Sequence, residues 1–131
     1  MLHFQLPIYH KVAELQRAIF EGAKHVRRDV KPTLGRLLME ESLYASTLVR
    51  RANVASGLQR VAQVELLLEQ LELVQLAVRQ GRDAGLLMNP LYEATMPIFV
   101  HAGKQATGWK QNALEEAEKA AAAAKDRQVS P

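Results

Sequence analysis

The segment from about Leu58 to Arg82 constrains the fold most, because it is the most apolar part of the chain and its apolar residues recur with the period of a helix. Its near-heptad seam consists of Val64, Leu67 or Leu68, Leu71, Val74 and Val78. A second flank adds Leu66, Leu73 and Ala77. Because one neighbouring helix would not cover both surfaces, we expect this helix at the centre of a bundle or in contact with another subunit.

Two helices are predicted before this segment. The first begins at Pro7 and ends near Lys31-Pro32, because the residue before a proline is pushed out of the helical region. Its apolar stripe consists of Ile8, Val12, Leu15, Ile19, Ala23 and Val26. Thr33 is expected to cap the second helix, which frays over residues 53–57. The apolar positions of the second helix are Leu34, Leu37, Leu38, Tyr44, Ala45, Leu48 and Val49.

A fourth helix is predicted to begin at Asn89-Pro90, after Gly81 and Gly85 have stopped the third. Pro97 should kink it or divide it into two pieces. Its large apolar residues are Leu91, Tyr92, Ile98, Phe99, Trp109 and Leu114. No segment alternates at the period of a strand, so the predicted fold is all-α, an antiparallel up-down four-helix bundle over residues 1–112. Residues 113–131 are rich in alanine and offer little to pack, which predicts a frayed or disordered charged extension.

The residue types leave little room for catalysis. The chain has no cysteine, and its four histidines, at positions 3, 10, 25 and 101, show no metal-ligand spacing beyond a loose His25 and Asp29 pair. A di-iron bundle would need inward Glu-x-x-His pairs, which are absent, so Glu65, Glu69 and Glu72 are interpreted as a solvated strip. We therefore predict a protein that is not an enzyme and holds no metal or cofactor. No leader-like or membrane-spanning run occurs, so a soluble cytoplasmic protein without a membrane partner is expected.

Basic charge gathers in the first half of the chain. Residues 1–60 carry ten Lys and Arg against five Asp and Glu, whereas residues 61–131 carry seven against nine. On a helix, Lys24, Arg27, Arg28 and Lys31 would share one face, and their mutual repulsion would be relieved by an external anion. Arg36, Arg50, Arg51 and Arg60 add further charge. This pattern favours nucleic-acid binding through phosphate contacts, and an ordinary solvated helix end is the alternative.

The stretch "HAGKQATGWKQN" places two glycines beside the only tryptophan within a predicted helix. Each glycine costs a helix interior about 1 kcal/mol relative to alanine. We interpret Gly103 and Gly108 as sites where another helix backbone approaches closely, with Trp109 covering the contact. Whether that helix belongs to the same bundle or to a neighbouring subunit is open.

The order of these landmarks resembles the accessory variability determinant family of diversity-generating retroelements. The stretches that carry the resemblance are "LPIYHKVAEL", "KPTLGRLL", "RRANVA", "VRQGRDAGLL" and "HAGKQATGWKQ". They span residues 6–112. The most specific pieces are the Leu34-Gly35 pair after a basic, proline-containing turn, and the Gly-x-x-x-x-Gly-Trp of Gly103, Gly108 and Trp109.

The resemblance implies a non-enzymatic accessory protein that forms a homopentamer and binds the reverse transcriptase and the template RNA of its element, with DNA or an RNA/DNA hybrid as alternatives to RNA. Such proteins support the mutagenic cDNA synthesis of mutagenic retrohoming. Arg79 and Arg82 match basic positions of the family pattern, whereas Glu69, Glu72 and Gln75 weigh against nucleic-acid contacts along the middle of the third helix.

Two other functions remain open at this point. One is a structural or interaction bundle related to proteins encoded in ribosomal RNA intervening sequences, with no nucleic-acid role. The other is a helical scaffold whose basic patch binds an acidic protein.

Overall fold

A computed structural model describes residue 2 and residues 5–129 of the chain. The described residues form four α-helices and no strand: α1 (Pro7–Ala23), α2 (Arg36–Val54), α3 (Gly57–Asp83) and α4 (Asn89–Val129). The prediction of an all-α, four-helix fold is confirmed. None of these helices combines the length and apolarity that a membrane span requires.

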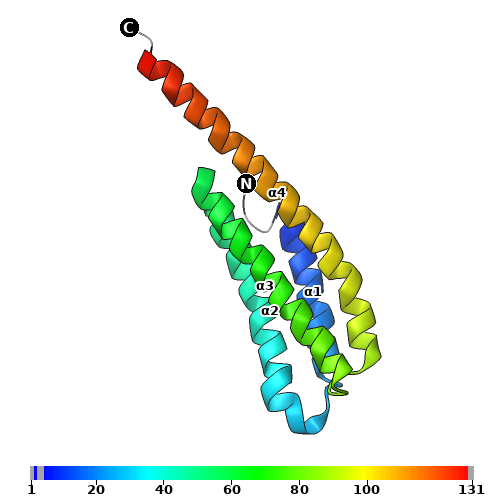
Figure 1. Ribbon diagram of the computed structural model, residues 1–131. Helices are drawn as coiled ribbons and strands as arrows, with labels where there is room; N and C mark the ends of the chain where they lie inside the picture. The colour runs from blue at the N-terminus through cyan, green and yellow to red at the C-terminus, as the bar shows by residue number, and fades with distance from the viewer. Residues whose placement is uncertain (1, 3–4, 130–131) are drawn as a thin grey trace.

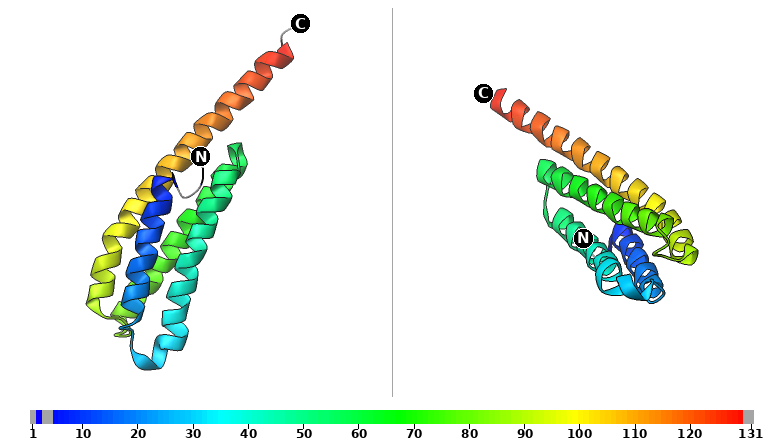
Figure 2. Two further views of the ribbon diagram at one scale, coloured as in Figure 1. Left: turned by 180° about the vertical axis from the view of Figure 1, so that it is seen from behind. Right: turned by 60° about the horizontal axis from the view of Figure 1, so that its bottom comes forward.

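Short turns join the helices, and each turn sends the chain back along the helix before it (Figure 1). α4 packs on α1 and α3, and α2 packs on the same two helices (Figure 2). We call the end that holds the α1–α2 turn and the α3–α4 loop the turn end. The other end holds the α2–α3 turn, and because α4 projects beyond it, we call it the extension end (Figure 1).

The core lies along the shared axis of the helices, where apolar stripes from all of them meet. The whole predicted stripe of α1, from Ile8 to Val26, is buried. The predicted seam of α3 is buried as well, with Leu67 completely enclosed and Leu68 packed at its edge. Heptad spacing thus located the core correctly, because an apolar side chain on this face has no other way of leaving water.

The predicted end of the first helix is wrong. α1 stops at Ala23, well before Lys31-Pro32. Val26 turns into the core, and Arg27 is extended, with φ −52° and ψ 133°, so that its backbone N–H donates to the carbonyl of Leu86 at 3.2 Å. A short 3₁₀ turn, η2 (Arg28–Val30), and a π turn, η3 (Lys31–Gly35), then lead into α2. A tertiary contact with the α3–α4 loop has therefore replaced the last helical turns.

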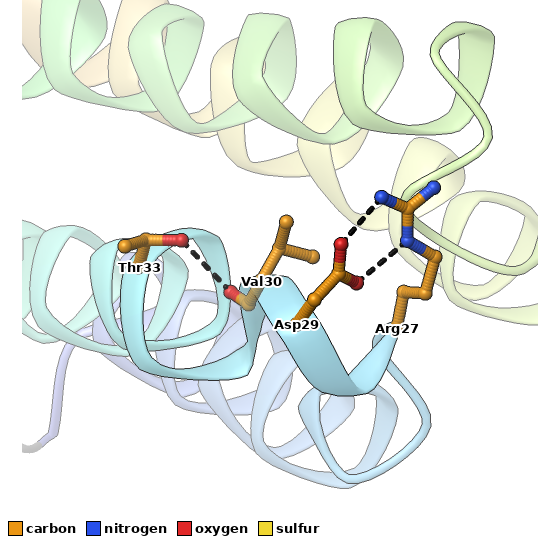
Figure 3. A network of polar contacts seen from close by, with 4 residues as sticks. All are labelled: Arg27, Asp29, Val30 and Thr33. Atoms are coloured by element: carbon orange, nitrogen blue, oxygen red, sulfur yellow. Dashed lines mark hydrogen bonds and ion pairs between the residues drawn. The ribbon is translucent and has the colours of Figure 1, made fainter.

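Thr33 does not cap α2 as predicted. It lies inside η3, and its hydroxyl donates to the carbonyl of Val30 at 3.1 Å (Figure 3). The side chain therefore closes the turn that precedes α2 rather than accepting from the first N–H groups of the helix.

α4 differs from its prediction at two places. It passes through Pro97 as one helix, so the predicted division into two pieces is wrong. Pro97 and Glu93, the residue four positions before it, are both exposed, so water can satisfy the carbonyl that the missing proline N–H leaves free. The helix then continues to Val129, so the described part of residues 113–131 belongs to α4. Ala113 is buried, so the contact with the bundle also extends past residue 112.

The stop of α3 was predicted from two glycines that have different roles. Gly85 has φ +73°, and the N–H groups of Gly85 and Leu86 donate to the carbonyls of Arg82 and Gly81 at 2.9 and 2.8 Å. This is the Schellman ending that favours glycine. Gly81 lies inside α3, where a Cβ would come within 2.8 Å of Leu87 Cδ1. It permits close packing of the α3–α4 loop.

Candidate nucleic-acid interface

The turn end gathers basic residues from two segments that are distant in the sequence. One segment is residues 24–36, between α1 and α2, and the other is the end of α3 with Arg79 and Arg82. Two contacts join them: the backbone bond from Arg27 to Leu86, and the packing of Leu34 against Gly81. The turn end is therefore a basic surface that no single helix face could provide.

The predicted single helical face of Lys24, Arg27, Arg28 and Lys31 does not exist, because α1 ends before it. Lys24 is the C-cap residue of α1, Arg27 is extended, Arg28 begins η2 and Lys31 begins η3. The four side chains still remain at the turn end, exposed to solvent. The helical geometry from which these four residues were predicted as one face is therefore wrong, although their side chains still lie at the same end of the bundle.

Three of the cations at the turn end are already paired. Arg27 donates twice to the Asp29 carboxylate, at 2.6 Å each (Figure 3), which lowers the pKa of Asp29 below its ordinary value of 3.8 and raises the pKa of Arg27. Arg36 pairs with Glu40 at 2.7 Å, and Lys24 pairs with Glu21 at 3.1 Å. Because all these pairs are exposed, a phosphate can compete for the cations at little cost.

Arg28, Lys31 and Arg79 differ from their neighbours. All three are exposed, and none of their side chains forms a hydrogen bond or an ion pair with another described residue. Their charge is not neutralised within the chain. They are the cations of the turn end that an incoming phosphate would meet first.

Arg82 contributes less to that surface. Its guanidinium lies over the ring of Tyr92 at 3.6 Å from the centroid and donates to Asp83 at 2.9 and 3.2 Å. The hydrogen bonds to Asp83 raise the pKa of Arg82. Tyr92 and Asp83, which we did not include in the predicted site, thus hold Arg82 against the α3–α4 loop.

The predicted cations Arg50, Arg51 and Arg60 lie at the opposite, extension end. Arg36 and Arg50 are fourteen residues apart in α2, which corresponds to about 21 Å. Arg60 donates to the carbonyls of Ala52 and Asn53 at 3.0 Å each, so it caps the end of α2. The ten predicted cations therefore do not form one surface.

The other two arginines of the extension end differ in how they are held. Arg51 donates to the hydroxyl of Tyr44 at 3.2 Å, and its guanidinium lies 5.7 Å from the centre of that ring. The side chain of Arg50 is exposed and forms no hydrogen bond or ion pair within the described part of the chain. Arg50 is thus the one residue of this predicted trio whose charge is not engaged within the described chain.

The exposed strip of α3 between the two ends is acidic. Glu65, Glu69 and Glu72 all face solvent, which confirms the interpretation of these residues as a solvated strip. Glu65 pairs with Lys110 of α4 at 3.4 Å. Their charge disfavours phosphate contacts along the middle of α3.

The predicted packing residues separate into three groups. Leu66 and Leu73 lie on the outer side of α3 and remain 44% and 46% exposed. Ala77 and Trp109 instead pack against the core, and Trp109 shares a hollow with Leu6, Pro7 and Ile8. Trp109 thus contacts the beginning of α1 in its own bundle.

The two glycines of α4 do not mark a close approach within the described chain. A Cβ at Gly103 or Gly108 would find no atom within 4 Å beyond its immediate surroundings in the helix. The close approach occurs instead at Gly22, where a Cβ would lie 2.9 Å from Leu91 Cγ, and at Gly81. No sequence pattern near Gly22 predicts this close approach, because it depends on how the start of α4 packs against α1.

Metal chemistry has no support in the arrangement. His10, His25 and His101 are exposed, and His3 lies outside the described residues. No three His, Asp or Glu side chains of the described residues come together as a metal site would require. Asp29 bonds with Arg27 rather than with His25.

Comparison with protein-family models, with curated proteins and with solved structures finds no match for this chain. The class of protein that the fold defines is thus a four-helix, all-α protein with a basic turn end.

Proposed function

We propose that this chain is a non-enzymatic accessory subunit of a diversity-generating retroelement, of the accessory variability determinant kind. It binds template RNA and the reverse transcriptase of its element in the cytoplasm and supports mutagenic cDNA synthesis. The observation that carries the RNA part is the turn end, where segments from α1–α2 and α3 bring together Arg28, Lys31 and Arg79, each without a partner among the described residues. The other parts of the proposal, namely the retroelement, its reverse transcriptase and mutagenic cDNA synthesis, rest on the order of the sequence stretches that resemble the family.

The positions of those landmarks on the fold agree with the proposal. "LPIYHKVAEL" opens α1, "KPTLGRLL" covers η3 and the start of α2, and "VRQGRDAGLL" ends α3 and enters the loop. Two of these three stretches meet at the turn end. A basic surface to which two of the family-like stretches contribute supports an RNA-binding role.

The test is a titration of template-derived RNA against the protein at rising salt, with and without the reverse transcriptase. We expect the logarithm of the association constant to fall linearly with the logarithm of salt concentration, because phosphate contacts release counterions. A protein that binds neither the RNA nor the polymerase at low salt would contradict the proposal.

The assembly is part of the same proposal: an antiparallel up-down bundle that associates as a homopentamer. Support comes from the outer side of α3, where Leu58, Leu66, Leu73 and Leu76 are all exposed. Exposed leucines that recur on one side of a helix favour a contact with another subunit. Light scattering at micromolar concentration measures the subunit number directly, and a strictly monomeric protein would refute this part without affecting RNA binding.

One observation favours a second candidate, a structural bundle related to proteins of ribosomal RNA intervening sequences. Six of the ten predicted cations, namely Lys24, Arg27, Arg36, Arg51, Arg60 and Arg82, already contact groups of their own chain within the described residues. The genes adjacent to this one distinguish the candidates. A reverse transcriptase gene with a near-duplicate variable repeat supports the first, and a ribosomal RNA gene supports the second.

A further inference from the structure

A groove between α1 and α2 combines an apolar floor with a basic border. Phe20 and Met39 face each other across it, and Leu43 follows Met39 one turn along α2; the three side chains are 39%, 41% and 56% exposed. At the turn end the groove opens into a hollow of about 600 Å³. The hydrogen bond between Ser46 and Gln16, at 3.2 Å, holds the two helices together beyond the apolar trio.

Cations border this apolar trio at both ends. In α1 and its cap, Arg17, Phe20 and Lys24 occupy positions i, i+3 and i+7, which share one helix face. In α2, the face that carries Met39 and Leu43 begins with Arg36 and ends with Arg50. The full border consists of Lys24, Lys31 and Arg36 at one end and of Arg17 and Arg50 at the other.

Most of this border is available to an outside partner. Arg17, Lys31 and Arg50 are exposed and have no ion pair with any described residue. The carboxylates near the groove are Glu40 and Glu21, which pair with Arg36 and Lys24 in exposed bonds. The groove is therefore complementary to a helix that is apolar along one face and acidic beside it.

The outer face of α3 has that composition. Leu58, Leu66, Leu73 and Leu76 fall within an arc of about 80° on a helix of 3.6 residues per turn, and all are exposed. Glu69 and Glu72 lie beside them and have no ion pair among the described residues. The leucines extend over eighteen residues, or about 27 Å, compared with about 21 Å between Arg36 and Arg50.

The apolar surface continues from α3 onto α2. Gln70 of α3 donates to the carboxylate and the carbonyl of Glu41, at 2.6 and 2.8 Å, which sets the register of the two helices. Leu37 and Tyr44 lie one turn on either side of Glu41 and are exposed. The acidic leucine face of α3 is thus broader than one helix, as a docking surface needs to be.

We propose that the α3 face of one copy docks into the α1–α2 groove of the next, with its leucines on Phe20, Met39 and Leu43 and its carboxylates among the cations. The inference rests on the proposed self-association and assigns its two complementary surfaces. The contact is heterologous, so each copy uses both surfaces, and the proposed pentamer is the ring that such a contact forms when its rotation closes. A contact of groove with groove would set cation against cation, which costs binding energy.

An aliphatic and thioether floor favours a protein helix over nucleic acid. Bases bind single-strand grooves by stacking on flat rings, and among the described residues that line this hollow only Phe20 is aromatic. Met39 and Leu43 instead match the packing of apolar side chains from another helix.

Two double variants test the proposal. Met39→Gln with Leu43→Gln makes the groove polar, and Leu66→Gln with Leu73→Gln makes the α3 face polar; all four side chains are exposed, so the fold should survive. Met88→Gln is the control, because it removes an exposed apolar side chain outside both surfaces. Circular dichroism checks folding, and light scattering measures mass.

We expect each of the first two variants to be monomeric, near 14.6 kDa, while the control assembles like the wild type. Their equimolar mixture should form a one-to-one heterodimer, because only one intact groove and one intact α3 face remain. If the groove variant assembles normally while the α3 variant does not, the α3 face pairs with itself and the groove assignment is overturned, although self-association stands.

Other outcomes overturn the proposal in distinguishable ways. A mixture that stays monomeric shows that the two surfaces are not partners. A groove variant that keeps its wild-type mass but loses binding to a single-stranded RNA or to the reverse transcriptase shows that another molecule occupies the groove. A monomeric wild type removes both this inference and the proposed pentamer.

Discussion

The turn end and the extension end of the bundle are both basic, but their cations have different roles. At the turn end, Arg28, Lys31 and Arg79 have no partner among the described residues. At the extension end, Arg60 caps the carbonyls of Ala52 and Asn53. An arginine that closes a helix end is not available to a phosphate. The comparison shows that the number of cations on a surface is a poor measure of how many of them can bind a phosphate. Whether a cation is available depends on the hydrogen bonds that it already makes within the chain.

The largest effect is expected from removing the free cations of the turn end. The triple variant Arg28→Ala, Lys31→Ala, Arg79→Ala should lower RNA affinity on the order of a hundredfold at about 0.1 M salt and reduce the salt slope by about three, because three phosphate contacts are lost. Fluorescence anisotropy over a salt series measures both quantities. The turn end should remain folded, since none of the three side chains forms a hydrogen bond or ion pair with a described residue.

The matched control removes the same charge from the projecting part of α4. The variant Lys119→Ala, Lys125→Ala, Arg127→Ala removes three exposed cations from the part of α4 that projects past the other helices. We expect their loss to have little effect at physiological salt, where screening limits long-range attraction. Equal losses in the two triple variants would mean that RNA responds only to net charge and that the turn end is no specific surface.

Arg60 gives the opposite signature. Arg60→Ala should leave RNA affinity nearly unchanged and lower the free energy of unfolding by about 1–3 kcal/mol, because two helix-end carbonyls lose a charged donor. Arg60→Lys keeps the charge but cannot reproduce the two-pronged geometry, so most of the loss should persist. Chemical denaturation measures it, with Arg50→Ala as the control that should unfold like the wild type. An Arg60→Ala variant of normal stability that binds RNA weakly would reverse the assigned roles.

The fold was largely readable from the sequence, and the site was only partly so. Apolar spacing identified four helices and the core residues of α1 and α3, because burial of an apolar stripe depends on a period that the sequence carries. The end of α1 was not readable. It depends on Arg27 bonding to Leu86, a residue about sixty positions away, and on the burial of Val26. Local propensity cannot anticipate a tertiary contact of this kind.

The candidate site illustrates the same limit. The sequence located the basic residues. Which of them form ion pairs depends on the local backbone conformation, which the sequence did not predict. Arg27 meets Asp29 only because the chain between them is extended and then forms η2. Arg60 was predicted to contact nucleic acid, since nothing in the local sequence shows that it reaches back to α2. The continuation of α4 to Val129 agrees with the high helix propensity of the alanines in this stretch.

Two glycine substitutions are expected to change the stability of the bundle in opposite directions. Gly85 at the turn end has φ +73°, so Gly85→Ala should lower the free energy of unfolding by about 1 kcal/mol. Gly108 lies in an ordinary helical stretch of α4 with open space around its Cα, so Gly108→Ala should raise it by about 0.5–1 kcal/mol. Urea denaturation of both variants measures the difference. If Gly108→Ala instead dissociates the assembly, the position is a subunit contact, and the packing role predicted from the sequence holds between copies.

The smallest predicted effect concerns Asp29, which occupies Arg27 at the turn end. Asp29→Asn should raise RNA affinity about threefold at low salt, because Arg27 becomes free to meet a phosphate, and the gain should vanish as salt rises. Glu118→Gln, which neutralises an exposed carboxylate on the projecting part of α4, is the control for the change in charge.

The ion pair with Arg27 lowers the pKa of Asp29, so the contribution of this pair to stability is complete above the ordinary carboxyl value of 3.8 and is lost as pH falls through the lower folded value. RNA affinity should therefore show no dependence on Asp29 titration near neutral pH, and an equal gain in the two variants would show that Arg27 was never withheld from the ligand.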